Sequence, residues 1–264
     1  MKRIFSIVLS IVLALTIIPF YAGAESSSEI KVGDSIEFGS YYQTSDGNGG
    51  FNKEPIKWNV LKVENGKALL LSSKIIDAAR YNNTSATVNG YYGNNYAHSE
   101  VRKWLIDDFF NSAFTENEKN CILETTLDNS ACATDYNASG SYNKYSSEST
   151  TDKVFLLSKN EIDTLASKYM NKSVTDYAKS RGFQQIVSTE ACNAWLTRTA
   201  GNNTFQIYYV QIRWGNWTTY YNWNDDKITV KMGACPAIWV DMEKINKVND
   251  GLVKGSYTWL SDNQ

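Results

Sequence analysis

The sequence predicts an α+β fold with short helices and a twisted antiparallel sheet. Three observations support this class: short β-like runs between residues 30 and 71, apolar residues at helical spacing in 99–110 and 158–169, and a second β-like region at 205–232. Strand-forming and helix-forming segments are therefore both present in one chain of 264 residues.

Composition indicates a folded globular protein. The chain is 42% hydrophobic and 20% charged, and it carries 8 Trp, 17 Tyr and 10 Phe, which excludes an intrinsically disordered chain. Removing Lys2 and Arg3 with a leader leaves a formal charge of about −4 and no basic blocks, so binding to nucleic acid is not expected. The single histidine, His98, excludes His-rich zinc sites.

The N-terminus has the pattern of a signal peptide, residues 1–24. A basic start is followed by an apolar run at 4–18 and an Ala-Gly-Ala cleavage signal at 22–24. We therefore expect a secreted, extracellular protein with no stable membrane insertion after cleavage. An uncleaved membrane anchor is the alternative, although the apolar run is shorter than the ~20 residues that a spanning helix needs.

The four cysteines form an even set in an oxidising compartment and allow three pairings. We expect disulfides between Cys121 and Cys132 and between Cys192 and Cys235. Free buried thiols are the alternative.

The first strands are expected at 30–42, 56–63 and 67–71, with a hairpin turn at Asn65-Gly66 and a break at 46–50. A helix is expected from Ser99 to Phe110.

Three further helix starts are predicted from capping patterns. They are Thr115-x-x-Glu118, Ser158-x-x-Glu161 and Ser173-x-x-Asp176, and the last helix should stop at Gly182.

Two stretches rich in Asn, Tyr and Ser, 81–96 and 135–151, are expected to be surface loops. Neither resembles an interdomain linker, and we find no internal repeat. The simplest partition is one domain at 29–242 followed by a C-terminal extension at 243–264.

The segment 205–232 contains the clearest candidate for a binding surface. A two-residue turn at Gly215-Asn216 would place Trp214 opposite Trp217 and Ile212 opposite Thr219. One face would then be dry, with Tyr208, Val210, Ile212, Tyr221 and Trp223, and the other would meet water or a ligand. The candidate ligand-binding residues are Tyr209, Gln211, Arg213, Trp214, Trp217 and Tyr220, together with Arg198.

Six short runs in order also carry a family resemblance: GDSIEFGSYYQ (33–43), EPIKWNVL (54–61), KWL (103–105), DKVFLLS (152–158), WLTRT (195–199) and GACPAI (233–238). The chain resembles the domain of unknown function that is common in exported proteins of clostridia and other gut Firmicutes. That family is similar to the C-type-lectin-like and formylglycine-generating-enzyme-like fold. The resemblance implies a C-type-lectin-like architecture for 29–242. It does not imply formylglycine-generating activity, because no pair of copper-binding cysteines matches.

The run Trp223-Asn224-Asp225 also resembles the Trp-Asn-Asp element through which C-type lectins bind calcium and sugar. It would make Asn224, Asp225 and Asp226 calcium ligands. Calcium takes about six to eight oxygens, and the companion Glu-Pro-Asn element is missing. We therefore expect no cofactor, with a solvated turn in place of a calcium site.

Catalysis has no positive signal in the sequence. The carboxylates of Asp107-Asp108 and of Asp225-Asp226 are adjacent and point in different directions. We expect a non-catalytic recognition domain that binds a glycan or an extracellular protein through an aromatic, Asn-rich surface. The alternative is a secreted hydrolase acting on cell-wall or dietary polysaccharide, which would need two carboxylates with perturbed pKa in a desolvated cleft.

Overall fold

The computed structural model describes residues 30–135, 145–184, 186–187, 191–213, 216–220 and 227–245. These residues form two five-stranded sheets, two small two-stranded ribbons and several short helices. The α+β class predicted from the sequence is confirmed.

The first sheet has the strand order β1-β2-β3-β14-β7, and all of its neighbouring strands are antiparallel. Asn65 and Gly66 have positive φ angles of 49° and 74°, which confirms the tight turn predicted between β2 and β3. The strands are β1 (Ser35–Ser45), β2 (Phe51–Glu64), β3 (Lys67–Ser72), β14 (Ala237–Asp241) and β7 (Val154–Phe155).

The second sheet has the order β12-β11-β10-β13-β4. Its β10 and β13 strands run parallel, with Trp195 opposite Gly233, so this sheet is mixed where the sequence predicted an antiparallel one. The strands are β12 (Asn216–Tyr220), β11 (Ile207–Arg213), β10 (Trp195–Ala200), β13 (Met232–Ala234) and β4 (Asp77–Ala79). The small ribbons are β5 (Thr125–Leu127) with β6 (Thr150–Asp152), and β8 (Ile186–Val187) with β9 (Ala191–Cys192).

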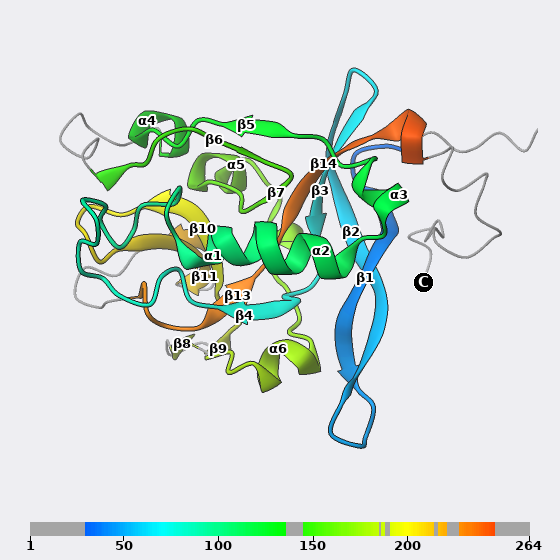
Figure 1. Ribbon diagram of the computed structural model, residues 1–264, viewed down its shortest axis with the longest axis horizontal. Helices are drawn as coiled ribbons and strands as arrows, with labels where there is room; N and C mark the ends of the chain where they lie inside the picture. Colours follow the sequence, from blue (N-terminus) through cyan, green and yellow to red (C-terminus); the bar gives the residue numbers. More distant parts are fainter. Residues whose placement is uncertain are drawn as a thin grey trace, which may run out of the picture.

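A continuous helical segment crosses in front of the two sheets (Figure 1). It consists of α1 (Glu100–Trp104), the π-helical η1 (Leu105–Phe109) and α2 (Phe110–Ala113). The hydroxyl of Ser99 accepts a hydrogen bond from the Arg102 backbone N–H and caps the start of α1. Val101, Leu105 and Phe109 are buried, as the helical spacing predicted.

Two of the three predicted helix starts are confirmed as complete capping boxes, at α3 (Glu116–Lys119) and α5 (Lys159–Asp163). The third is wrong in detail, because Thr175 and not Ser173 caps α6 (Asp176–Ser180). The chain then reverses at Gly182, where φ is 90°. The remaining helices are α4 (Ala131–Thr134) and the 3₁₀ turn η3 (Ser167–Tyr169).

One continuous core joins the two sheets. Trp58 of the first sheet and Trp195 of the second are both fully buried, and their indole N–H groups donate to Phe38 O at 2.7 Å and Met170 O at 3.0 Å. The β13 and β14 strands follow one another through Cys235 and Pro236, so a single passage of chain contributes to both sheets.

Candidate functional site

The predicted hairpin strands are paired, but their register differs by two residues from the expected one. Arg213 pairs with Asn216 and Ile212 pairs with Trp217, so the predicted pairing of Ile212 with Thr219 is wrong. Glycine suits the second position of a type I′ turn as well as the first position of a type II′ turn. The local sequence therefore did not distinguish a turn at 214–215 from one at 215–216.

The exposed face predicted for β11 is also not found where the structure describes it. Tyr209 and Gln211 are 1% and 5% exposed, and Val210 on the opposite face is fully buried. The register error does not cause this, because a shift of two residues leaves every side chain on its original face. Tyr209 and Gln211 are thus interior residues and do not form a ligand surface.

Both faces of β11 are buried because short helices cover one of them. On that face the Tyr208 hydroxyl donates to Asp135 Oδ2 at 2.9 Å, directly after α4. On the neighbouring β12, the Thr219 hydroxyl donates to Asp163 Oδ1 of α5 at 2.7 Å. Tyr209 on the other face belongs to the main core.

Arg198 is a structural residue and not a surface ligand contact. Its side chain is buried, and its guanidinium donates to Leu156 O at 3.0 Å, to Asn129 Oδ1 at 3.2 Å and to the Glu161 carboxylate. This arginine ties β10 to α5 and to the chain before α4. Its predicted role in ligand binding does not fit these contacts.

The remaining hairpin predictions lie outside the described residues. They concern the whole of Trp214 and the side chains of Arg213, Trp217 and Tyr220. The possible calcium ligands Asn224, Asp225 and Asp226 are outside as well. Within the described ranges, no group of three or more His, Cys, Asp or Glu side chains is arranged to hold a metal ion.

The expected cysteine pairs are not formed in the structure. Cys121 and Cys235 are buried free thiols, whereas Cys132 is exposed on α4. Figure 1 shows why Cys121 and Cys132 do not meet: α3, which Cys121 follows closely, and α4 lie at opposite ends of the molecule with β5 between them. A disulfide requires Cα atoms within about 7 Å. The side chain of Cys192 is outside the described residues.

The first Tyr/Asn-rich stretch meets the described end of the second, residues 145–151, whereas residues 136–144 lie outside the described residues. The rings of Tyr91 and His98 stack with centroids 3.5 Å apart, and His98 Nε2 lies 2.6 Å from Glu148 Oε1 of the second stretch. Tyr92 also contacts Tyr145 across the two stretches, at 5.6 Å between centroids. We call this surface the loop junction, made of Tyr91, Tyr92, Asn95, His98, Tyr145 and Glu148.

A tight turn presents Tyr91 at this surface. Val88 and Tyr91 exchange two backbone hydrogen bonds of 2.9 Å around Asn89 and Gly90, whose φ angles are 53° and 86°. This Asn-Gly turn is a recognised hairpin signal, and it could have been identified from the sequence. Tyr91 remains 41% exposed and offers its ring to solvent.

The asparagines of the first loop mostly hold the backbone in place. Asn94 donates to Asn203 O at 2.7 Å and to Gln206 O at 2.9 Å, and Asn82 donates to Gly93 O at 3.3 Å. A side chain at Gly93 would come within 2.7 Å of the Thr84 carbonyl oxygen, so only glycine fits there. The loop is therefore a pre-ordered platform.

Glu148 is held as a carboxylate at the centre of the junction. Asn95 donates to Glu148 Oε2 at 3.3 Å, and the Asn95 side-chain oxygen accepts from the His98 backbone N–H at 3.2 Å. Burial opposes ionisation, but hydrogen bonds from the backbone N–H of Glu148, from Asn95 and from His98 outweigh it, so the pKa of Glu148 is lowered. The junction thus combines an aromatic face with charged and amide groups.

A surface groove of about 310 Å³ adjoins the loop junction at His98. The groove runs along the start of the long helical segment, and Lys103 in it pairs with Asp107 at 2.6 Å. Its lining residues are Ala97, His98, Ser99, Glu100, Arg102, Lys103, Ile106 and Asp107. This groove would allow a ligand to extend beyond the loop junction.

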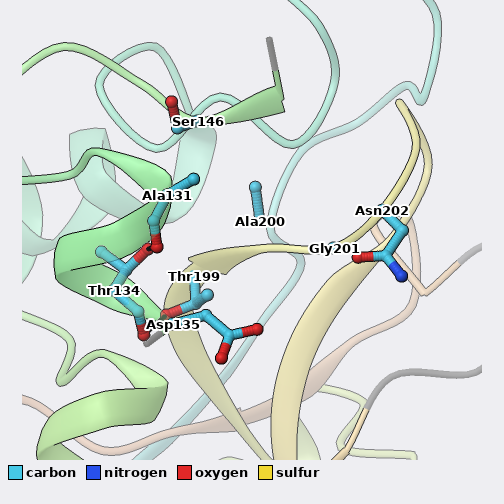
Figure 2. A pocket seen from close by; sticks show the side chains of 8 residues that line it. All are labelled: Ala131, Thr134, Asp135, Ser146, Thr199, Ala200, Gly201 and Asn202. Carbon is cyan, nitrogen blue, oxygen red and sulfur yellow. Dashed lines mark hydrogen bonds between the residues drawn. The ribbon is translucent and has the colours of Figure 1, made fainter. Parts of the chain in front are cut away.

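A second hollow lies between α4 and the end of β10 (Figure 2). Figure 2 shows Ala131 and Thr134 on one side and residues 199–202 on the other, with Asp135 between them. Asp135 accepts from the Tyr208 hydroxyl and lies 3.4 Å from Lys159 Nζ. The cavity volume is about 10 Å³, roughly the space of one water molecule, so this hollow is too small for a larger ligand.

Comparison with known proteins gives one match. The model of a family described as "Domain of unknown function (DUF6273)" matches residues 65–242, which is more than half of the chain. No curated protein and no solved structure matches the sequence or the fold. Among the described residues, none of the helices has the length and apolar character required to cross a membrane.

Proposed function

The chain belongs to the DUF6273 family of domains of unknown function, and we propose that it is an exported, non-catalytic recognition domain that binds a glycan at the loop junction. The observation that carries this proposal is the stacked pair Tyr91–His98, which is half exposed and is anchored by Glu148 from a distant loop. Export is proposed from the leader pattern at 1–24.

The chemistry of the loop junction suits a sugar better than an extended apolar partner. A sugar ring has an apolar C–H face, which packs on an aromatic ring, and a rim of hydroxyl groups, which need donors and acceptors. Tyr91 supplies the ring, the half-exposed Glu148 and His98 supply polar groups beside it, and the buried Asn95 holds Glu148 in place. A few polar groups placed around an aromatic surface are typical of small-ligand sites.

The hydrolase alternative has less support. Burial raises the pKa of Asp77, as a buried catalytic acid would require, but its carboxylate accepts hydrogen bonds from the Tyr41 hydroxyl at 2.9 Å and the Ala78 N–H at 2.7 Å. Neither cavity described above includes Asp77. Recognition without catalysis is therefore the function that we propose.

The proposal is tested with the chain lacking residues 1–24 on a glycan array, followed by calorimetric titration of the glycans that bind. Tyr91→Ala should weaken binding at least about tenfold, or about 1.4 kcal/mol, because it removes the stacking surface. Tyr42→Ala is the matched control, since Tyr42 on β1 is 40% exposed and lies outside the loop junction.

An array on which no glycan is bound would refute the proposal. So would glycan binding that Tyr91→Ala and Tyr42→Ala reduce to the same extent. Thermal unfolding of both variants checks that neither change has disturbed the fold.

A further inference from the structure

The β5–β6 ribbon presents a strip of polar side chains on its outer face. Thr126 pairs with Thr151, and Thr125 pairs with Asp152. Because side chains alternate along strands, Leu127, Thr150 and Asp152 point inward and are buried. The outer face is left to Glu124, Thr126, Thr151 and Lys153.

An aromatic residue lies on each side of this strip. On one side, Trp239 of β14 lines a cavity of about 300 Å³ together with Glu124 and Thr126. On the other side, Phe110 lines a cavity of about 190 Å³ together with Glu124 and Lys153. Glu124 borders both cavities, and we call the two together the β5–β6 groove.

The local folding of β14 explains the position of Trp239. Ile238 and Val240 are fully buried, so the alternating Trp239 side chain lies on the outer face of the first sheet. Its carbonyl oxygen accepts from the Leu123 N–H at 2.8 Å, which fixes the chain leading into β5 beside this ring.

Polar groups of the β5–β6 groove are available to a ligand. Glu124 and Lys67, which both line the Trp239 half, make no ion pair with any residue that the structure describes. The two threonine hydroxyls on the strip are exposed and hydrogen-bond each other at 3.4 Å, which leaves each of them capacity for a further hydrogen bond to a ligand. Asp152, which pairs with Arg102, faces inward and is not part of the strip.

Cations lie near both aromatic rings. Lys62 Nζ is 5.8 Å from the Trp239 ring and is paired with Glu64 at 2.7 Å. Lys153 Nζ is 5.4 Å from the Phe110 ring. Acidic and basic groups alternate, so the groove lacks the excess of positive charge that a nucleic acid needs. It also lacks the continuous apolar stripe that would receive an amphipathic helix.

We propose that the β5–β6 groove binds a saccharide chain, independently of the loop junction. The two aromatic rings, each partly buried against the core, offer apolar contact to a sugar face, and the hydroxyl, carboxylate and ammonium groups of the strip offer partners to its hydroxyls. Its two cavities lie on either side of the strip, so a ligand that fills both has to extend across it, as a section of a saccharide chain can.

The test uses the chain lacking residues 1–24 and calorimetric titration with cellohexaose, xylohexaose, chitohexaose and mannohexaose. Trp239→Ala should weaken binding of the preferred hexasaccharide at least tenfold. Thr126→Val and Glu124→Gln should each weaken it about threefold. These two substitutions lie on exposed positions, so they keep the test valid if Trp239→Ala disturbs the core.

The variants separate this site from the loop junction. Binding that survives Tyr91→Ala but falls with Thr126→Val and Glu124→Gln supports the β5–β6 groove. Binding lost with Tyr91→Ala and unchanged in the groove variants overturns the groove alone and leaves the loop junction. The absence of binding to all four hexasaccharides also overturns the groove, whereas the glycan array decides the loop junction separately.

Discussion

Lys172 is a buried amine in the centre of the molecule. Its side chain is 1% exposed, its ammonium donates to Ser72 O at 2.6 Å, and it lies 5.4 Å from the Trp195 ring. Burial lowers its pKa from 10.5 to about 8, because the low-polarity interior disfavours the charged form. Burial likewise raises the pKa of the neighbouring Cys235 thiol to about 12.

This lowered pKa predicts a pH-dependent stability. As the pH rises through about 8 the folded chain loses the Lys172 proton, while the unfolded chain keeps it up to about 10.5. The unfolded state then binds more protons, so the free energy of unfolding increases with pH in that window. Between pH 7 and pH 9 the increase should be roughly 1 kcal/mol.

Urea unfolding of the natural chain and of Lys172→Met at pH 7, 8 and 9 measures this contribution. The difference between the two isolates Lys172, because Cys235 and the other titrating groups are common to both. From pH 7 to pH 9, the free energy of unfolding should rise more for the natural chain than for Lys172→Met. If the free energies of unfolding of the two chains change with pH in parallel, burial does not lower the pKa of Lys172.

At the level of single elements, short helices begin where their first N–H groups find acceptors. At α5 the Ser158 hydroxyl accepts from the Glu161 N–H at 3.2 Å, and the Glu161 carboxylate accepts from the Ser158 N–H at 2.6 Å. At α6 the hydroxyl of Thr175, and not that of Ser173, accepts from the Ala178 N–H at 3.1 Å. The Ser173 carbonyl oxygen instead accepts from the Ile75 N–H at 2.9 Å.

These two serines make a matched pair of substitutions. Ser158→Ala removes a fully buried cap and should lower the free energy of unfolding by about 1 kcal/mol. Ser173→Ala removes an exposed hydroxyl with no capping role and should change it by less than about 0.5 kcal/mol. Chemical denaturation measures the free energy of unfolding of both variants. Equal losses would mean that Ser173 contributes to the start of α6 after all.

At the scale of the whole molecule, the region matched by the family model and the folding unit do not coincide. The family match starts at residue 65, in the turn between β2 and β3. Yet β1 and β2 form one edge of the first sheet and contribute the buried Ile36, Ile56 and Trp58 to the common core. Removing them would expose β3 and the apolar side chains beneath the sheet.

Truncation tests this difference. A chain beginning at residue 65 should show no cooperative thermal unfolding by circular dichroism, because it loses two strands and a large part of its core. A chain beginning at residue 29, the expected start of the domain, should unfold cooperatively. A sharp transition in the shorter chain would show that β1 and β2 are an accessory hairpin.

Part of the candidate site could be predicted from the sequence. The stretches 81–96 and 135–151 were predicted as surface loops from their composition, and Asn89-Gly90 carries a turn signal. The contact between His98 and Glu148 was not predictable, because it joins residues fifty positions apart. The β5–β6 groove likewise depends on Trp239 and Glu124 being brought together by the first sheet.

By itself, the sequence determined the α+β class, the turn at Asn65-Gly66 and the capping boxes at Thr115 and Ser158, since each depends on a few neighbouring residues. Only the tertiary structure decided that Tyr209, Gln211 and Arg198 are interior and that Cys121 and Cys132 lie apart. The physical reason is that burial depends on what covers a surface. The main core covers the Tyr209 face of β11, helices α4 and α5 lie against the Tyr208 face, and nothing in the sequence of that strand records either contact.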